Sequence, residues 1–297
     1  MIRLDNVKVK YKDKVALDLG RVIEIKDGEK VGIIGSNGAG KTTLIKSILG
    51  LVPYEGNITL GIPKNKIAVH MQQNEYIDTV PIKIIIEMVS GTSIKSNDKL
   101  REMIDFFDFK DCLNKRWKHL SGGQKQRLTL ILVMCQDSPI SIFDEVTSGL
   151  DYETRQRLMD KLIDWYKGKN DTLLISSHYY EELENLATKI LYIDKGRVVD
   201  YGSKEELFQK YCGKSVVVFK DRPEAVRIAE NYNKIKSSAG YTCISCKDIG
   251  EEESVIKKLI HSNINYRRSD NDIEIMTLNA KEYFKRGIDN EQIYYKI

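Results

Sequence analysis

The chain has 297 residues, of which 41% are hydrophobic, and a formal net charge of +4 at pH 7. Such a length suits one large or two smaller domains that bury their own core without disulfides or metals. Because charges of both signs are interspersed, the small positive excess argues against nucleic-acid binding, and the longest apolar runs fall far short of the roughly 18 to 20 residues that cross a bilayer. Any membrane role is therefore expected to depend on a partner.

The first fifty residues predict several strands and then a helix. Residues 1–27 suggest two or three short strands with a turn at 12–14. Residues 30–34 (KVGII) form a short apolar run that suits a strand buried on both faces. After a glycine-rich turn, apolar residues recur with helical spacing from residue 44 to the Gly50 stop. The turn therefore joins a strand to a helix.

The next part of the chain alternates helices and strands. The expected elements are two helices between residues 81 and 119, a helix over 121–135, a strand at 139–143, a helix at 152–166, a strand at 171–177, a helix at 179–187 and a hairpin over 190–200. Strands that alternate with helices indicate an α/β fold with a mainly parallel sheet covered on both faces.

The pattern changes after residue 212, and we expect a small α+β domain over residues 213–297. Its expected elements are a strand at 214–220, a helix at 223–233, a strand at 240–246, a helix at 251–263 and a strand at 272–278. We expect the first domain to span residues 1–212.

A phosphate-binding motif occupies the glycine-rich turn. The run matches G-x-x-x-x-G-K-[ST], in which inward-turned amides and a helix N-terminus hold phosphate. Lys41 is expected to reach the β- and γ-phosphates of ATP, and the Thr42 hydroxyl to bind Mg²⁺. The nucleotide-binding candidates here are Gly35, Ser36, Asn37, Gly38, Ala39, Gly40, Lys41, Thr42 and Thr43.

Two acids, Asp144 and Glu145, end the expected strand at 139–143. An apolar strand that ends in two acids is a weak signal by itself. Beside a phosphate loop, however, Asp144 can hold Mg²⁺ through water and Glu145 can polarise the attacking water. The pair therefore predicts a hydrolytic site.

Residues 120–127 read LSGGQKQR, and this run resembles the signature of the ABC (ATP-binding cassette) ATPases. Ser121, Gly122, Gly123 and Gln124 open a helix N-terminus, which favours a γ-phosphate. The resemblance covers about residues 1–210. It implies a P-loop NTPase fold of ABC type with an N-terminal β-subdomain and a helical subdomain at about 76–135. It also implies a head-to-tail pair of subunits, in which each signature faces the phosphate loop of the other across a shared ATP.

Further residues match the family in chain order. Residues 148–151 (SGLD) resemble the D-loop, with Asp151 near nucleotide, and His178 resembles the switch histidine that contacts the γ-phosphate. Gln72 resembles the Q-loop glutamine that touches Mg²⁺, with Gln73 as the alternative. Tyr11 stands where the family stacks an aromatic ring on adenine, although a strand-end tyrosine more often only packs.

The sequence departs from the family pattern in two places. Val146 stands where the family usually has proline, and the stretch between Gly56 and Gln72 is short, which predicts a trimmed β-subdomain. None of the groups expected to act on ATP is replaced. We therefore expect active hydrolysis, with Glu145, His178, Gln72 and Lys41 as its catalytic groups.

A cassette followed by a small α+β tail resembles the ATPase subunits of bacterial ABC-2-type exporters of drugs, peptides or lipids. This resemblance implies a homodimer, or a dimer with a closely related second ATPase subunit. It also implies a separate integral membrane permease and a cytoplasmic position on the inner face of the cell membrane. The alternatives are a soluble ABC ATPase not coupled to transport and a module regulated through its tail. Partners are expected to include no nucleic acid.

Overall fold

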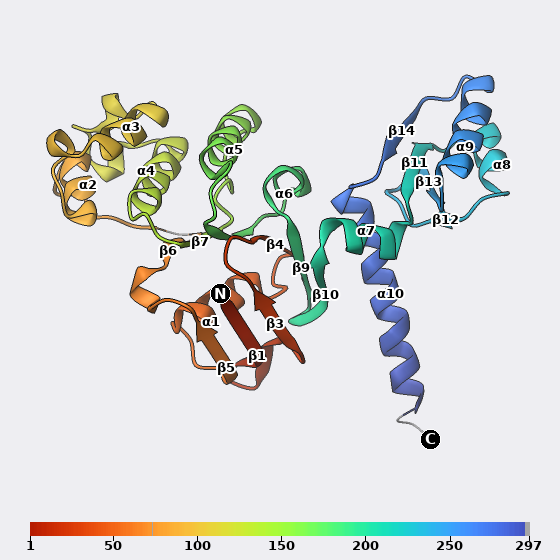
Figure 1. Cartoon of the computed structure of the whole chain (residues 1–297), viewed down its shortest axis with the longest axis horizontal. Helices are drawn as coiled ribbons and strands as arrows, with labels where there is room; N and C mark the ends of the chain where they lie inside the picture. Colours follow the sequence, from red (N-terminus) through yellow and green to blue (C-terminus); the bar gives the residue numbers. More distant parts are fainter. Residues whose placement is uncertain (73, 295–297) are drawn as a thin grey trace.

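The computed structural model describes residues 1–72 and 74–294, with side chains up to residue 286. Within this part of the chain, ten strands form one sheet in the order β3-β1-β2-β10-β9-β4-β8-β7-β6, with β5 paired to β1. This sheet lies at the centre of the molecule, between a group of helices and a smaller sheet (Figure 1). Its strands are β1 Ile2–Tyr11, β2 Lys14–Asp18, β3 Val22–Ile25, β4 Lys30–Ile34, β5 Glu55–Leu60, β6 Ala68–His70, β7 Ile140–Asp144, β8 Thr172–Ser176, β9 Lys189–Asp194 and β10 Arg197–Ser203.

The central sheet has a parallel half and an antiparallel half. Strands β9, β4, β8, β7 and β6 pair in parallel. Strand β1 pairs antiparallel with β2, β3 and β5, and β10 returns antiparallel to β9. Apart from β10, the antiparallel half comes from the first sixty residues, and β10 joins it to the core by a parallel pairing with β2. The N-terminal segment therefore forms a curled extension of the parallel core.

Helices cover both faces of the parallel half. Successive residues of a strand point to opposite faces. Accordingly Ile33 and Ile142 pack with α1 and the N-terminal strands, whereas Ile34 and Phe143 pack with the helices of the other face. Burial on both faces explains the apolar strand sequences, and the predicted α/β fold with a mainly parallel core is confirmed. The covering helices are α1 Lys41–Leu49, α4 Gly122–Met134, α5 Tyr152–Tyr166 and α6 Tyr180–Leu186.

A helical lobe extends from the β6 edge of the sheet. Helices α2 (Ile82–Ser90) and α3 (Asp98–Phe106) pack with α4 around buried residues such as Ile86, Met103 and Phe107. Figure 1 places this lobe at the opposite end of the molecule from the small sheet. Short 3₁₀ helices complete the connections here and before β6, at Lys64–Lys66, Ile94–Ser96, Lys110–Cys112 and Trp117–His119.

The C-terminal part is a four-stranded sheet with helices on both faces. Its order, β12-β13-β11-β14, together with the chain order β11-α8-β12-β13-α9-β14, defines a split βαβ fold. Helices α8 and α9 cover one face, around Val217, Ile244 and Leu259. The elements are α7 Lys204–Cys212, β11 Ser215–Lys220, α8 Pro223–Ala229, β12 Lys234–Ile235, β13 Tyr241–Cys246, α9 Ile249–His261, β14 Tyr266–Ser269 and α10 Ile273–Tyr294.

One sequence expectation was wrong: residues 272–278 do not form a strand but begin the long helix α10. The apolar Ile273 and Ile275 alternate as in a strand, but burial continues with helical spacing through Met276 and Ala280. Asp272 begins the helix, because its carboxylate accepts a hydrogen bond of 2.8 Å from the Ile275 amide. The polar pair Asn271-Asp272 was the signal that pointed to a helix start.

Helix α7 was not expected from the sequence either. Ser203 and Glu206 form a capping box at its start, a pattern that is visible in the sequence as S-x-x-E. Strands β5, β6, β12 and β14 were also missed. Of these, β6, β12 and β14 are short and lie at sheet edges.

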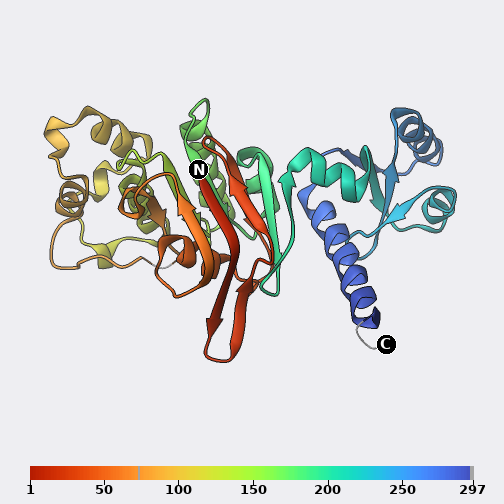
Figure 2. The same ribbon diagram turned by 60° about the horizontal axis from the view of Figure 1, so that its bottom comes forward.

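The core of the central sheet continues into the C-terminal part. Phe208 and Cys212 of α7 belong to the same buried cluster as Val216 of β11 and Met276 of α10. Lys281 of α10 pairs with Asp194 of β9 at 2.9 Å. Figures 1 and 2 both show α10 beside α7, with α8 and α9 on the far side of the small sheet. The two parts therefore share a core on either side of residue 212, where the expected domain boundary remains a proposal.

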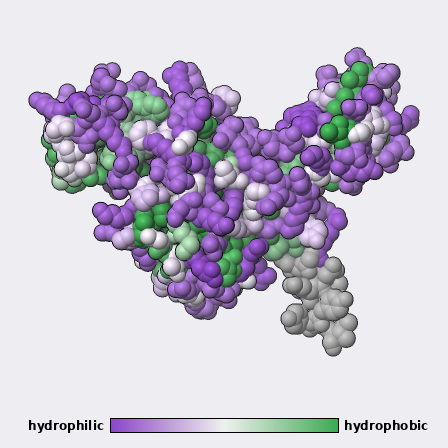
Figure 3. Space-filling view, viewed as in Figure 1, coloured by the Kyte–Doolittle hydropathy of each residue, from purple (hydrophilic) through white to green (hydrophobic). Residues whose placement is uncertain are grey.

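The surface is largely polar. Figure 3 shows hydrophilic residues over most of one face, with small apolar patches between them. Among the described residues, no helix is both long enough and apolar enough to cross a membrane.

Candidate functional site

The phosphate loop connects β4 to α1, and glycine is required at two of its positions. A Cβ on Gly35 would lie 2.2 Å from the carbonyl oxygen of Ile193 on β9, which no side chain can tolerate. Gly40, directly before α1, has a φ of +111°, a conformation that only glycine adopts without strain. The loop therefore turns tightly between neighbouring strands and directs the N-terminus of α1 into the site.

Lys41 is the first residue of α1 and is 4% exposed. Its Nζ donates to the Gly35 carbonyl at 2.9 Å and lies 3.4 Å from Glu145 Oε1. Burial lowers the pKa of Lys41, and the nearby Glu145 opposes that shift. The ammonium is thus held across the loop, where the amides that receive phosphate also lie.

Asp144 lies under the start of α1, at the end of β7, and is fully buried. Its Oδ2 accepts a hydrogen bond from Thr42 Oγ1 at 2.7 Å, and its Oδ1 accepts one from Ser176 Oγ at 2.5 Å. Ser176 was not singled out from the sequence; its only signal was its place at the end of a neighbouring parallel strand. The two hydrogen bonds fix the carboxylate against the phosphate loop.

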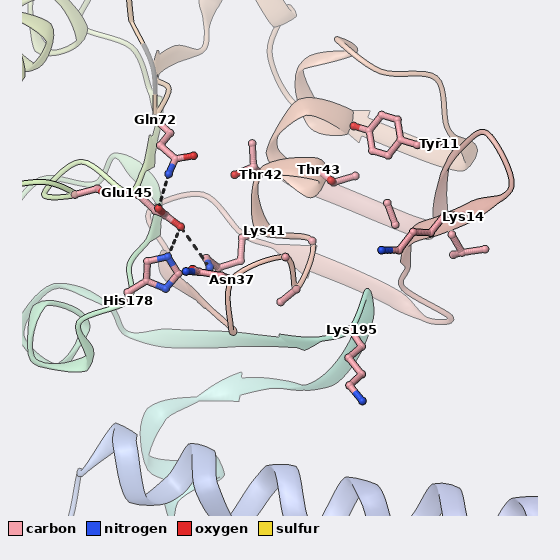
Figure 4. A pocket seen from close by; sticks show the side chains of 16 residues that line it. Tyr11, Lys14, Asn37, Lys41, Thr42, Thr43, Gln72, Glu145, His178 and Lys195 are labelled. Carbon is pink, nitrogen blue, oxygen red and sulfur yellow. Dashed lines mark hydrogen bonds and ion pairs between the residues drawn. The ribbon is translucent and has the colours of Figure 1, made fainter.

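Glu145 receives three donors, and Figure 4 shows them converging on its carboxylate. Gln72 Nε2 donates to Oε2 at 2.9 Å, while His178 Nε2 lies 2.6 Å and Lys41 Nζ 3.4 Å from Oε1. Glu145 has a φ of +52°, a strained conformation for a residue with a side chain, and its amide donates to Ser176 Oγ at 3.1 Å. Ser176, at the end of β8, therefore helps to hold the strained backbone of Glu145, and strain of this kind is common at reactive sites.

These groups line a cleft of about 770 Å³. Of the nine candidates in the phosphate loop, Asn37 to Thr43 line it, whereas Gly35 and Ser36 lie behind and accept from Lys41. Tyr11 also lines the cleft, at the end of β1, and is 44% exposed. Its ring lies at the outer part of the cleft in Figure 4, away from Glu145.

The cleft also has lining residues that the sequence did not suggest. They come from the start of β2 and from the β9–β10 turn. Both segments approach the phosphate loop from outside, and the Gly196 amide donates to Ala39 O at 2.8 Å. No local pattern marks such residues, because only the packing of the turns brings them to the loop. They are Lys14, Val15, Ala16 and Lys195.

The signature residues do not line this cleft. Ser121 caps α4 in a capping box: Ser121 Oγ accepts from the Gln124 amide at 3.3 Å, and Gln124 Oε1 accepts from the Ser121 amide at 3.1 Å. Ser121 and Gly122 are exposed, and the Gly123 position lies against Thr154. The helix N-terminus is therefore formed and open to solvent on a different element from the phosphate loop.

Asp151 also lies outside the cleft. Its carboxylate caps α5 by accepting from the Thr154 amide at 3.0 Å, and this hydrogen bond lowers the pKa of Asp151. Ser148, three residues earlier, does line the cleft. The alternative glutamine, Gln73, lies outside the described residues.

The donor set beside the phosphate loop fits Mg²⁺. A hydroxyl from Thr42 and a carboxylate from Asp144 face each other at 2.7 Å, and Gln72 uses its amide nitrogen on Glu145, which leaves its oxygen for another partner. Mg²⁺ prefers such oxygen ligands and keeps several waters. Thr42 and Gln72 would hold the ion directly and Asp144 through water, where it would neutralise charge on the transferred phosphoryl group.

A strand, a glycine-rich phosphate loop and a helix, with two acids at the next strand end, define a P-loop nucleotide hydrolase. A family model described as ABC transporter matches residues 22–148. The Nod factor export ATP-binding protein I of Burkholderia orbicola is 30% identical over 239 residues, which cover 75% of this chain and 77% of that protein. The chain therefore belongs to the ABC transporter ATP-binding proteins, and it is an ATPase subunit of that family.

Two further comparisons describe its neighbours. The methionine import ATP-binding protein MetN of Lactobacillus delbrueckii is 29% identical over 73% of this chain and 72% of that protein. A dimeric structure of the cassette MJ0796, described as a post-hydrolysis state bound to ADP and Pi, superposes with a TM-score of 0.61 at 23% identity, over 68% of this chain and 98% of that one. Export and import proteins are thus both among the relatives.

Proposed function

We propose that this ATPase subunit drives an exporter of ABC-2 type. The observation that supports the proposal is the match to the Nod factor export protein, at 30% identity over 75% of this chain and 77% of that protein. Import is the second candidate, because MetN aligns over a similar share of the chain. A transported drug, peptide or lipid is proposed from the resemblance alone.

The catalytic roles follow from the contacts of Glu145. A γ-phosphate in the cleft would compete for Lys41 and His178, because both are donors that otherwise hold the Glu145 carboxylate. Glu145 would then be available to orient and deprotonate the attacking water. Gln72 keeps the other carboxylate oxygen and connects it to the β6 side of the site. Tyr11 is proposed to stack on adenine.

The open signature helix supports a two-subunit site. Its N-terminus, at Ser121 to Gln124, is formed and exposed but does not reach the cleft of its own chain. A second copy, or a related subunit, could present the same helix end to the γ-phosphate. The dimeric structure of a cassette with the same fold supports this arrangement. ATP would then hold the pair together, and hydrolysis would loosen it.

The permease is proposed to dock on the helical lobe. Large apolar side chains are exposed there, with Met88 68%, Ile77 59% and Val89 45% exposed, and exposed apolar groups of this kind suit a protein contact. Closure of the pair would move the lobe with α4 and thereby act on the permease. We propose on this basis that the chain lies on the cytoplasmic side of the membrane.

Co-expression with the multi-span protein of a neighbouring gene tests the proposal. The two proteins should co-purify in detergent, and inside-out vesicles holding both should take up the substrate with ATP, as expected of an exporter. If only right-side-out vesicles with internal ATP take up the substrate, the direction of transport is import and the export proposal is wrong. A chain that binds no integral membrane protein, and whose ATPase rate no permease changes, would overturn the transporter assignment.

A further inference from the structure

Two of the groups proposed for hydrolysis, Glu145 and His178, lie on separate loops. Glu145 begins the loop 145–151 that leads into α5, and His178 lies in the turn between β8 and α6. The two side chains meet, with His178 Nε2 2.6 Å from Glu145 Oε1. Because a displacement of about 1 Å near a reacting group can cost about a hundredfold in rate, both backbones need a common support.

The side chain of Glu182, on α6, accepts hydrogen bonds from both loops. Its side chain is 4% exposed, and its Oε2 accepts from Thr147 Oγ1 at 3.1 Å and from Ser177 Oγ at 2.6 Å. Thr147 lies two residues after Glu145, and Ser177 directly precedes His178. One buried carboxylate oxygen therefore joins the two loops.

Arg155 of α5 holds the other side of the His178 turn. Its guanidinium carbon lies 3.7 Å from the ring centroid of Tyr179, the residue after His178, and 5.4 Å from that of Tyr152. The Tyr179 amide in turn donates to Ser177 Oγ at 2.9 Å. Both neighbours of His178 are thus fixed by contacts that lead to Glu182 or Arg155.

Arg155 and Glu182 also face each other directly. Arg155 Nε lies 3.8 Å from Glu182 Oε1, and neither atom has a hydrogen-bond partner among the described residues. This separation is too long for a direct hydrogen bond. A shift of α5 by about 1 Å would form a charge-assisted hydrogen bond. Asp151 and the residues before it lead directly into that helix.

We propose that Glu182 and Arg155 are positioning residues that hold the loop 145–151 and the His178 turn as one unit. The inference rests on the roles proposed for Glu145 and His178. Neither Glu182 nor Arg155 lines the cleft, so both act through the residues that they hold.

The test is steady-state ATP hydrolysis by the full chain, with binding of the fluorescent analogue MANT-ATP measured beside it. Glu182→Gln should lower kcat about tenfold, equivalent to about 1.4 kcal/mol in the barrier, with KM and MANT-ATP affinity unchanged within error. Thr147→Val and Ser177→Ala should each lower kcat severalfold, and Thr147→Ser should restore it. Because both hydroxyls act through one carboxylate, the double variant should lose less than the product of the two single losses.

The matched control is Glu181→Gln, the same change at the adjacent, exposed position of α6, which should leave kcat unchanged. A kcat for Glu182→Gln within twofold of wild type overturns the inference, as does a fall in kcat that comes with an equal loss of MANT-ATP affinity. If that variant does not fold, Thr147→Val and Ser177→Ala decide the matter, and independent, multiplying effects count against a shared support. A fully active Glu145→Gln would instead refute the proposed catalytic roles themselves.

Discussion

Replacing Glu145 by glutamine separates ATP binding from ATP hydrolysis. Both oxygens of the carboxylate have donors beside them. Gln72 Nε2 donates to Oε2 at 2.9 Å. His178 Nε2 lies 2.6 Å and Lys41 Nζ 3.4 Å from Oε1. A glutamine can present its oxygen to only one side, so its NH₂ group would meet Gln72. Turning over the Gln72 carboxamide restores a hydrogen bond. We therefore expect the free energy of unfolding to change by about 1 kcal/mol or less.

The effect on activity should be far larger. An amide cannot take the proton of the attacking water, and a general base contributes roughly 10²- to 10⁴-fold to a rate. The kcat of Glu145→Gln should fall by that factor, equivalent to about 3 to 5 kcal/mol in the barrier. ATP affinity should persist because Lys41 and the loop amides remain in place. Unhydrolysed ATP should then keep two subunits together.

Phosphate release and light scattering after gel filtration measure the two effects. At saturating ATP and Mg²⁺ the variant should elute with twice the chain mass of 34.1 kDa, whereas wild type should return to the monomer as ATP is consumed. Glu153→Gln, at an exposed position of α5, is the control and should match wild type. A kcat within tenfold of wild type, or a variant that stays monomeric with ATP, would refute the reasoning.

The remaining predictions concern binding, the shared core and pH. Lys41→Ala should weaken ATP binding roughly 10- to 100-fold in calorimetry, because charge-assisted hydrogen bonds to phosphate of about 1.5 to 3 kcal/mol are lost. Met276→Ala should lower the free energy of unfolding in urea by about 2 to 5 kcal/mol in one transition, because α10 shares a core with the cassette. The third prediction concerns the difference in free energy of unfolding between wild type and Glu182→Gln. As the pH rises above 4.5, this difference should shift against wild type. Burial raises the pKa of Glu182 from that ordinary value, and Glu181 raises it further, whereas Ser177, Thr147 and Arg155 oppose the shift. The stability that comes with the raised pKa is therefore lost as the carboxyl ionises.

Each of these three predictions has a control variant or measurement and an outcome that would contradict it. Lys46→Ala, further along α1, should keep the wild-type ATP affinity; unchanged affinity in Lys41→Ala would remove that lysine from the phosphate site. Met88→Ala, at a 68% exposed methionine, should cost under about 0.5 kcal/mol, and two separate urea transitions for wild type would contradict the shared core. For the pH series, thermal shift between pH 4 and 8 should show a changing Tm difference; a constant difference would exclude a raised Glu182 pKa.

The sequence by itself determined the features that depend on neighbouring residues. The phosphate loop could be recognised because the Gly35–Thr42 spacing fulfils a backbone requirement that few other sequences meet. The signature helix start at Ser121 follows from a local capping pattern, and the alternation of apolar strands with helices decided the α/β class. These features need no knowledge of distant residues, since φ preferences, caps and side-chain periodicity act within a few positions.

The tertiary structure decided what depends on contacts across the chain. Residues 272–278 carry both an alternating and a helical apolar pattern, and only packing against α7 and the small sheet selects the helix. Lys195 reaches the cleft, and Glu182 reaches Thr147, because separate elements pack side by side. Local sequence carries no record of such partners. Burial free energy is gained only when the whole core forms, so these contacts are determined by the assembled fold.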